Sequence, residues 1–287
     1  MKMQLIFLMF LGYKIESGEM QIIREKNKET ILFYGGVVIT DTNAVITSPS
    51  ATYLSKDGVM ELSGPVSGFY QTRNLKCDYA KIYEKERIFK GYRRCDIQGP
   101  AETLRCDSII LHGDSLLAFG DVYLKSEKDS VEAEGNEVLI RDKFLRVRGN
   151  ALLKSTSSDS LALKSFFYVY RDSILSASGN VIVNSKDFEA SGDSLYYDRR
   201  ERFFSLYGNA LVRDQKNTVT GPQVIVFLNT ENKIDSALSF PGGSLKNAEN
   251  GKEIFIEGDT LKFYSEGTDS LKWFKGYKIK GYYKEEE

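Results

Sequence analysis

Short apolar segments alternate with short polar segments along almost the whole chain. Residues 179–212 hold one full copy of this pattern: an apolar segment from Gly179, a polar link, a second apolar segment from Gly192, another polar link, and the next apolar segment from Gly208. Apolar runs of this length bounded by turn-forming residues are typical of β-strands. The copy contains no helical segment, so the sequence predicts an all-β protein.

Two markers repeat along the chain with a period of about 29 residues. The first is a glycine at the start of each copy, with successive steps of 29, 27, 29, 29, 30 and 29 residues. The second is a pair of apolar residues two positions apart, with steps of 29, 29, 29, 28, 29, 29 and 37 residues. A fixed period of this size indicates a repeat architecture. The glycines are Gly35, Gly64, Gly91, Gly120, Gly149, Gly179 and Gly208. The pairs are Ala51/Tyr53, Ala80/Ile82, Ile109/Leu111, Val138/Ile140, Phe166/Tyr168, Leu195/Tyr197, Val224/Val226 and Leu261/Phe263.

The links between apolar segments are short and polar, for example residues 54–58, 84–87 and 170–173. Links of this length join antiparallel neighbours, whereas the corners of a parallel β-helix rarely resemble hairpin loops in every repeat. Eight copies of two strands predict about sixteen strands in one continuous antiparallel stack.

Alternation along each strand predicts which side chains face the interior. We expect one inward pair in each strand, and together these pairs form the candidate wall of an apolar groove. The candidate groove residues are Ala51, Tyr53, Ala80, Ile82, Ile109, Leu111, Val122, Leu124, Val138, Ile140, Ala151, Leu153, Phe166, Tyr168, Val181, Val183, Leu195, Tyr197, Ala210, Val212, Val224 and Val226. A long trough lined by such residues suits acyl chains better than a compact polar ligand.

Composition and motifs exclude several classes of function. The 287 residues carry 39 basic and 40 acidic side chains, so no global field attracts nucleic acid. The single histidine, His112, and the lack of C-x-x-C spacing argue against a metal or redox site. Asp78, Asp107 and Asp193 recur at equivalent positions, which favours a role in turn geometry over one active site. The sequence therefore predicts neither an enzyme nor a cofactor.

The N-terminus differs from the repeats. Met1 and Lys2 precede an apolar run over residues 3–11, which is too short to span a bilayer and fits the core of a secretory signal peptide. We expect residues 1–18 to be a signal peptide, with cleavage between Gly12 and Gly18. The alternative is a buried N-terminal strand. Residues 19–283 are predicted to form a single repeat domain, and residues 284–287 a charged tail.

Three cysteines lie in neighbouring predicted strands. If these strands pair through their turns, Cys95 falls opposite both Cys77 and Cys106. One disulfide is then possible in an oxidising compartment, with either partner. The alternative is that all three are small buried hydrophobic residues.

The repeated motifs resemble those of the OstA-like or LptA-like lipopolysaccharide-transport family, which includes LptA, LptC and the N-terminal domain of LptD. The residues that carry the resemblance are Gly120-Asp121-Val122, Gly149-Asn150-Ala151, Gly179-Asn180-Val181, Gly208-Asn209-Ala210, Cys77-Asp78-Tyr79-Ala80, Cys106-Asp107-Ser108-Ile109 and Gly192-Asp193-Ser194-Leu195. The resemblance covers roughly residues 33–264. It implies an elongated antiparallel β-jellyroll of V-shaped cross-section, or β-taco, that is open along one side.

The resemblance also implies a function and a location. Such a protein would pass lipopolysaccharide, or a similar acyl lipid, through its groove from inner-membrane to outer-membrane partners. It would work in the periplasm, peripheral to the cell outer membrane, and would join the β-jellyroll domains of its partners end to end. Because the chain is longer than the short bridge proteins, it could be the bridge, an anchored relative or a detached translocon domain.

Strand pairing at the ends offers a route to assembly. Residues 30–34 and 271–279 are apolar runs without proline near the two ends of the stack, so we expect them to be edge strands that pair with a partner or head to tail with a second copy.

Two other functions fit parts of the pattern. A structural or adhesive β-repeat protein at the cell surface would have the same repeats but no lipid ligand. A β-helical enzyme acting on polysaccharides would need carboxylates clustered in one or two copies, and the carboxylates here are spread over the repeats.

Overall fold

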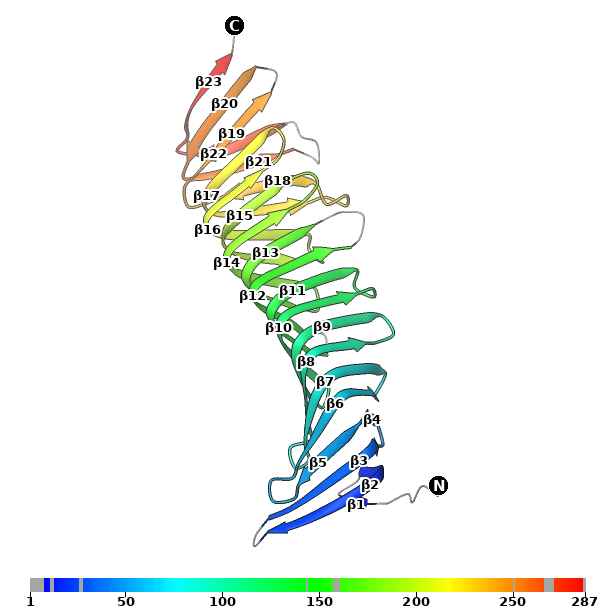
Figure 1. Ribbon diagram of the computed structural model, residues 1–287. Helices are drawn as coiled ribbons and strands as arrows, with labels where there is room; N and C mark the ends of the chain where they lie inside the picture. The colour runs from blue at the N-terminus through cyan, green and yellow to red at the C-terminus, as the bar shows by residue number, and fades with distance from the viewer. Residues whose placement is uncertain are drawn as a thin grey trace. The chain divides into compact units, whose positions relative to one another are not determined.

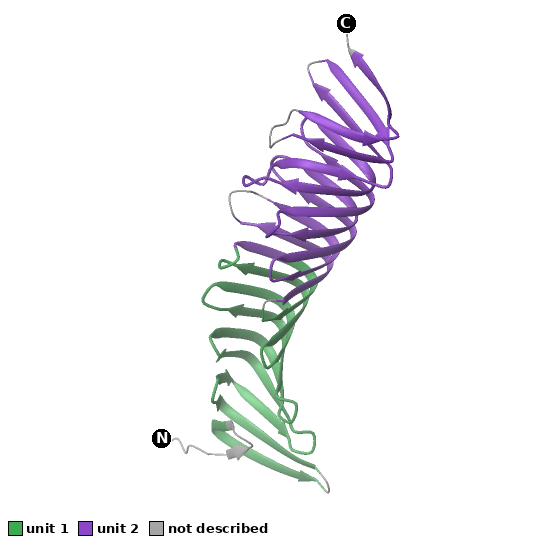
Figure 2. Cartoon of the chain, turned by 180° about the vertical axis from the view of Figure 1, so that it is seen from behind, with its two compact units in different colours: residues 1–129, 134–142 green, residues 130–133, 143–287 purple. Residues whose placement is uncertain are grey.

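The computed structural model describes residues 8–10, 13–25, 28–142, 144–156, 161–249, 251–265 and 271–285. These residues form 23 β-strands and no helix, which confirms the all-β prediction (Figure 1). The chain divides into two compact units (Figure 2): residues 1–129 with 134–142 form unit 1, and residues 130–133 with 143–287 form unit 2.

Unit 1 contains ten complete strands and most of an eleventh, β11, whose first residues belong to unit 2. The strands are β1 (Leu8–Phe10), β2 (Tyr13–Glu25), β3 (Lys28–Asp41), β4 (Ala44–Ser48), β5 (Ser50–Leu54), β6 (Val59–Tyr70), β7 (Arg73–Tyr83), β8 (Ile88–Gln98), β9 (Glu102–His112), β10 (Ser115–Ser126) and β11 (Val131–Arg141).

Unit 2 contains the remaining twelve strands. They are β12 (Phe144–Ser155), β13 (Ala162–Arg171), β14 (Ile174–Asn184), β15 (Glu189–Asp198), β16 (Phe203–Arg213), β17 (Asn217–Leu228), β18 (Ile234–Ser239), β19 (Gly243–Glu249), β20 (Lys252–Gly258), β21 (Thr260–Tyr264), β22 (Trp273–Tyr277) and β23 (Lys280–Glu285).

Neighbours in sequence pair as antiparallel strands within each unit. β6 to β10 pair consecutively in unit 1, and β12 to β17 pair consecutively in unit 2. The structure has 23 strands where about sixteen were expected, partly because four bent strands are each divided into two shorter strands. For example, β4 and β5 both pair with β3, at residues 37–41 and 30–33 respectively, so together they form one bent strand. The predicted antiparallel hairpin connectivity is confirmed.

Most long strands bend sharply near their middle. In every second strand the bend contains residues with positive φ, and we call this site the corner. The residues are Gly35 and Gly36 in β3, Gly64 in β6, Arg93 and Arg94 in β8, Gly120 and Asp121 in β10, Gly149 and Asn150 in β12, Gly179 and Asn180 in β14, and Gly208 and Asn209 in β16. Glycine, asparagine and aspartate tolerate this left-handed conformation best, which explains the recurring Gly-Asn and Gly-Asp dipeptides. The repeated glycine therefore marks the middle of a strand, and its assignment to a strand start was wrong.

One repeat departs from this sequence rule. The corner of β8 is formed by Arg93 and Arg94, with φ of 61° and 49°, and Gly91 lies two residues earlier in regular strand. Arg94 makes an ion pair with Asp78, at 2.8 Å between Nη2 and Oδ2. Gly91 is therefore not equivalent to the other glycines: with Arg93 in its place, the step from Gly64 becomes 29 residues and the step to Gly120 becomes 27.

The corner creates two layers with an interior between them. In β14, Leu175 and Ala177 before the corner and Val181 and Val183 after it are buried, while the alternate residues are exposed. A single flat layer could not bury one face without a cover. The two halves of each strand must therefore face one another, and the ribbon shows this arrangement within each unit (Figure 1).

The N-terminal strands pair with the rest of unit 1. β1 pairs with residues 13–15 of β2, and β2 pairs with β3, where Ile15 is buried opposite Ile39. Half of the expected signal peptide, residues 1–7 and 11–12, lies outside the described residues, so the signal peptide stays a prediction. The assignment of residues 19–283 to a single domain also stays a prediction. Within the described part of the chain, no helix has the length and hydropathy needed to cross a membrane.

The structure corrects one of the two expected edge strands. Residues 30–34 lie in β3, which pairs with β2 on one side and with β5 on the other, so this segment is not an edge. Residues 16–25 of β2 pair only with β3 among the described residues and replace it as the edge segment of unit 1.

The other expected edge segment lies where the sequence placed it. Within the described part of unit 2, β22 pairs only with β21, and β23 only with β20. Both strands present exposed aromatic side chains, including Trp273 and Tyr277 in β22.

The corner geometry makes a direct prediction about stability. Gly179 has φ of +83°, and a Cβ atom there would lie 2.7 Å from the Cβ atom of Phe166. Replacing Gly179 with Ala should lower the free energy of unfolding by about 1–2 kcal/mol, because an L-residue is strained in this conformation. Urea denaturation followed by circular dichroism measures the effect. The neighbouring change Ser178→Ala, at an exposed position with ordinary φ, should alter stability by less than about 0.5 kcal/mol; equal effects of the two changes would contradict the role of the corner.

Candidate functional site

The candidate groove residues lie mainly on the inner faces of the two layers. Eighteen of the 22 are buried, with exposed fractions of 9% or less. They are Ala51, Tyr53, Ala80, Ile82, Ile109, Leu111, Val122, Leu124, Val138, Ala151, Tyr168, Val181, Val183, Leu195, Ala210, Val212, Val224 and Val226. The structure thus brings these side chains together within each unit as a continuous apolar lining.

Burial falls off toward the turns. Ile140, Leu153 and Tyr197 are half-buried, and each lies within three residues of the end of its strand. Ile140 and Tyr197 approach the turns at one end of the folded strands, and Leu153 approaches the turns at the other. At these three residues the interior is more accessible from the rims, by which we mean the two rows of turns. Other inner residues at the rims, for example Leu111, Val183 and Val212, are buried.

Phe166 is the one candidate whose inward orientation was wrong. Its side chain is 56% exposed, whereas Tyr168 is fully buried. Phe166 packs against the corner glycine Gly179, just as Asp107 packs against Gly120 and Asp193 against Gly208. Phe166 therefore occupies the outward corner position of its repeat, and the inward pair is Tyr168 and Tyr170.

Sequence reasoning missed about half of the inner lining. Because the glycine was taken as a strand start, the strand segment before it was left unassigned. Its inward residues are buried too, for example Leu175 and Ala177 in β14 and Phe204 and Leu206 in β16. The signal that could have found them is the alternation in residues 174–178 and 203–207, which continues through the corner.

The inner residues next to the corners in unit 2 form a cross-strand row, here called the inner row. Its members face one another directly in the strand register: Val147, Tyr168, Ala177, Leu195, Leu206 and Val224. All six have exposed fractions of 5% or less. Five are aliphatic, and Tyr168 is the single aromatic member.

One candidate also makes a polar contact at the rim of unit 1. Tyr53 is buried, but its hydroxyl donates a hydrogen bond to Oε2 of Glu84 at 2.8 Å. Burial and this bond raise the pKa of Tyr53 to about 12, so the hydroxyl stays protonated at neutral pH. The contact joins β5 to the turn after β7.

The lining becomes polar near one rim of β17 and β19. Asn217 and Asn247 are buried and face one another, and Nδ2 of Asn247 donates to Oδ1 of Asn217 at 2.8 Å. Nδ2 of Asn217 donates in turn to Oδ2 of Asp214 at 2.9 Å. These hydrogen bonds satisfy buried amides, and they limit the purely apolar lining in this part of unit 2.

The three cysteines cluster on the inner face of unit 1. Cys95 faces Cys106 directly in the register of β8 and β9, and its Sγ lies 3.0 Å from Sγ of Cys77. All three are buried and present as free thiols. The hydrogen bond that the Cys106 thiol donates to Cys95, together with burial, raises the pKa of Cys106, which keeps its thiol protonated. A side chain at Gly91 would collide with Cys77, so the glycine there provides room for the sulfur atoms.

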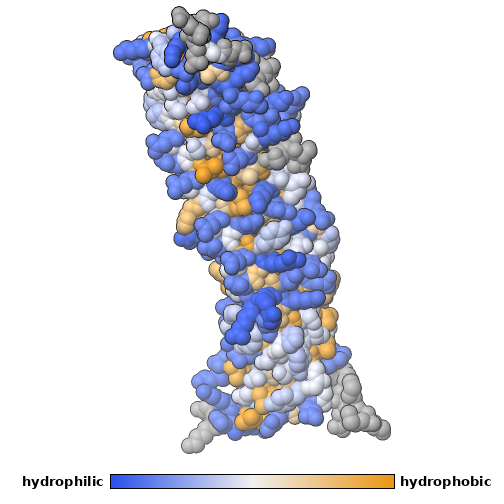
Figure 3. Space-filling model, turned by 45° about the horizontal axis from the view of Figure 1, so that its top comes forward, coloured by the Kyte–Doolittle hydropathy of each residue, from blue (hydrophilic) through white to orange (hydrophobic). Residues whose placement is uncertain are grey.

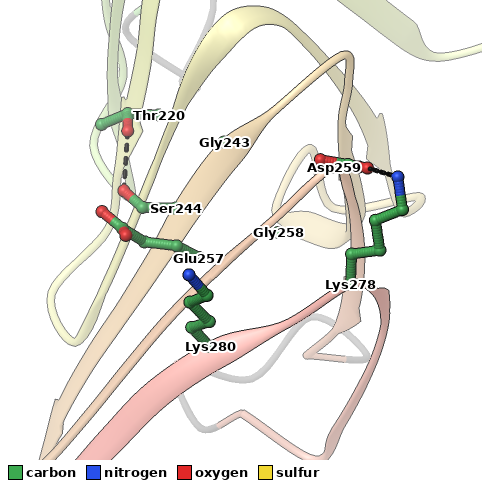
Figure 4. Close-up of a pocket in the computed structure, with 8 residues that line it drawn as sticks. All are labelled: Thr220, Gly243, Ser244, Glu257, Gly258, Asp259, Lys278 and Lys280. Atoms are coloured by element: carbon green, nitrogen blue, oxygen red, sulfur yellow. Dashed lines mark hydrogen bonds and ion pairs between the residues drawn. The ribbon is translucent and has the colours of Figure 1, made fainter.

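A polar hollow of about 470 Å³ lies on the outside of unit 2, near its last strands (Figure 4). Thr220 Oγ1 and Ser244 Oγ are 2.8 Å apart, and Lys278 Nζ lies 3.2 Å from Asp259 Oδ2. Its two lysines and two carboxylates balance in charge, and the lining is hydrophilic. This hollow is unsuited to acyl chains. Elsewhere on the face shown in Figure 3, hydrophobic residues lie in small areas separated by hydrophilic ones.

The comparison with known families agrees with this geometry. The family model described as LptA/(LptD N-terminal domain) LPS transport protein matches residues 14–232. The chain belongs to this family. Its role is therefore in lipopolysaccharide transport in the cell envelope, and, as a member of a transport family, it is not an enzyme. No curated protein matches the chain.

The thiol cluster generates a prediction about oxidation. Because Cys95 lies between the other two, we expect mild oxidation by a small-molecule disulfide to give one intramolecular disulfide that always contains Cys95. Peptide mapping by mass spectrometry under non-reducing conditions identifies the pair. Cys95→Ser should abolish the intramolecular disulfide, whereas Cys77→Ser should still allow Cys95 to pair with Cys106. A Cys77–Cys106 disulfide in the wild type would contradict the observed order of the three thiols.

Proposed function

We propose that this chain binds the acyl chains of lipopolysaccharide, or of a similar acyl lipid, between its two layers and passes the lipid between inner-membrane and outer-membrane partners. The observation that supports this proposal most directly is the apolar lining itself, which repeats at the same depth from strand to strand. Membership of a lipopolysaccharide-transport family supplies the substrate class. The proposed location is the periplasm, after export by the N-terminal signal peptide.

The fold offers a physical route for lipid entry. Within each layer the strands are held by hydrogen bonds, whereas the two layers meet in the interior mainly through apolar side chains. Moving the layers apart at the rims breaks few directional interactions, and an acyl chain restores the lost apolar contact. Each buried methylene contributes roughly 0.8 kcal/mol, so a chain of a dozen carbons provides several kcal/mol toward this opening. The half-buried rim residues Ile140, Leu153 and Tyr197 would be the first to contact the lipid.

A structural role without a ligand is the second candidate. The observation that favours it is the near-complete burial of the inner residues, since side chains already fill the space between the layers. Lipid extraction separates the two functions: protein purified from its own membrane context should carry acyl lipid detectable by mass spectrometry. Protein that remains free of lipid, and takes up none from lipopolysaccharide micelles, would favour the structural role.

A charge in the lining should abolish lipid loading. Leu195 is buried in the inner row, and Ser194 beside it faces outward on the same strand. Leu195→Asp places a carboxylate in a dry apolar interior without a partner, which is costly and repels acyl chains. We expect at least a tenfold loss of lipid per protein, measured by mass spectrometry on protein shown to be folded by circular dichroism. Ser194→Asp is the matched control and should load normally; equal loading by both folded variants would show that the inner row does not contact lipid.

The proposed partners are the β-jellyroll domains of the inner-membrane and outer-membrane transport machinery, joined by strand addition at the ends. β22 is a suitable edge because it has one strand partner in the described part of the chain and contains no proline. Its Trp273 stacks on Tyr264 of β21 with ring centroids 3.9 Å apart, so tryptophan fluorescence reports on this edge.

Proline in β22 should block this assembly. Phe274→Pro removes a backbone donor and disturbs the strand, so we expect concentration-dependent association to be lost in analytical ultracentrifugation. Lys85→Pro is the control, since Lys85 lies in an exposed turn where proline is tolerated. Association of Phe274→Pro equal to that of Lys85→Pro would exclude β22 as the joining edge.

A further inference from the structure

Tyr168 differs from every other member of the inner row in size and in reach. The equivalent positions in the other repeats are Ala80, Ile109, Val138, Leu195 and Val224, each in a strand that pairs with a corner-containing strand and each just after the bend of its own strand. None of these side chains is aromatic. Tyr168 is fully buried and is among the largest such side chains in the described residues.

The Tyr168 side chain extends from one layer to the other. Its backbone pairs with Val147 and Ala177 in the layer before the corner of β14. Its hydroxyl lies 3.5 Å from the carbonyl oxygen of Leu152, which belongs to the part of β12 after the corner and pairs with Lys164 in the opposite layer. The phenol ring therefore occupies the space between the two walls at this level of unit 2.

The surroundings of Tyr168 are matched to its size. Ala177 beside it in the inner row and Ala151 after the corner of β12 are both small and buried, and they leave room for the ring. The hydrogen bond to Leu152 is at the upper limit of length and holds the hydroxyl only weakly. Burial raises the pKa of Tyr168, so the side chain is neutral and compatible with an apolar ligand beside it.

We propose that Tyr168 sets the depth to which an acyl chain can enter the interior of unit 2, and so selects acyl lipids by chain length. This inference rests on the proposed lipid-binding function. An acyl chain that enters from the rim approaches the corner along the inner faces, and at β13 the ring stands across its path. On the next two strands, β14 and β15, the inner row has the smaller residues Ala177 and Leu195, which fill less of the space between the layers than Tyr168 does.

The test measures how affinity depends on acyl chain length. Saturated fatty acids from ten to eighteen carbons displace a fluorescent fatty acid from the purified full-length protein, and affinity is plotted against length. In a path without obstruction each added methylene raises affinity about fourfold. For the wild type we expect this increase to stop at a cutoff length.

Tyr168→Val introduces the residue that stands at Val147 and Val224 in the same row, and it should move the cutoff to longer chains by several carbons. If the valine variant does not fold, Tyr168→Leu takes its place in the test. Leucine keeps more of the buried volume and should move the cutoff in the same direction. Tyr168→Phe should keep the wild-type cutoff, because the ring and not the hydroxyl obstructs the path. Phe166→Val removes an aromatic ring from the exposed, outward position two residues earlier on the same strand and should also leave the cutoff unchanged.

The outcomes are distinct. A cutoff that stays the same in folded Tyr168→Val or Tyr168→Leu overturns the role of Tyr168 while leaving lipid binding intact. A shift in Tyr168→Phe as large as in Tyr168→Val also overturns it, since the hydroxyl would then be responsible. Failure of the wild type to bind either the fluorescent fatty acid or lipopolysaccharide overturns the proposed function, and this inference with it.

Discussion

The corner in the middle of every second long strand is the constraint on which the rest of the structure depends. One or two residues with positive φ redirect the chain while the strand pairing continues on either side, as at Gly179 and Asn180. Without such corners, 11-residue strands would form one flat sheet with an apolar face exposed to water. Because the corner recurs at the same place in every second strand, the folded layers stay in register along each unit. The 29-residue period is the spacing of these corners.

Once the strands are folded, the interior is defined by what lies on either side of each corner. The inner positions nearest the corner are the driest, whereas some of those near the turns, such as Ile140, Leu153 and Tyr197, are partly exposed. Under the proposed function, this difference would let an acyl chain enter from the rims and leave a charged or sugar-bearing headgroup there in water. It also explains why polar groups inside, such as Asn217 and Asn247, are bonded to one another. An unpaired amide in the same place would be costly.

Most of the fold and much of the lining could be predicted from the sequence, because both follow from alternation and period. Antiparallel pairing, the all-β class and eighteen inward side chains agree with the structure. The error in the strand boundaries has one cause: a glycine can mark a corner or a strand end, and its sequence context alone does not distinguish them. Gly91 was aligned with the corner glycines although Arg93 and Arg94 form that corner. Phe166 was read as inward because spacing cannot show that it occupies the place held by Asp107 and Asp193 in other repeats.

The departures from the repeat are where this chain acquires properties of its own. A repeat with identical units would have a uniform interior and could not distinguish one acyl chain from another. Tyr168 narrows the interior at one strand, the hydrogen-bonded asparagines make it polar at another, and the cysteines place three thiols at a third. Each departure is compatible with the corner geometry, since each lies on an inward position that the fold leaves free to vary. The backbone repeat thus supplies the common architecture of the family, and single inward substitutions provide the selectivity that we propose for this member.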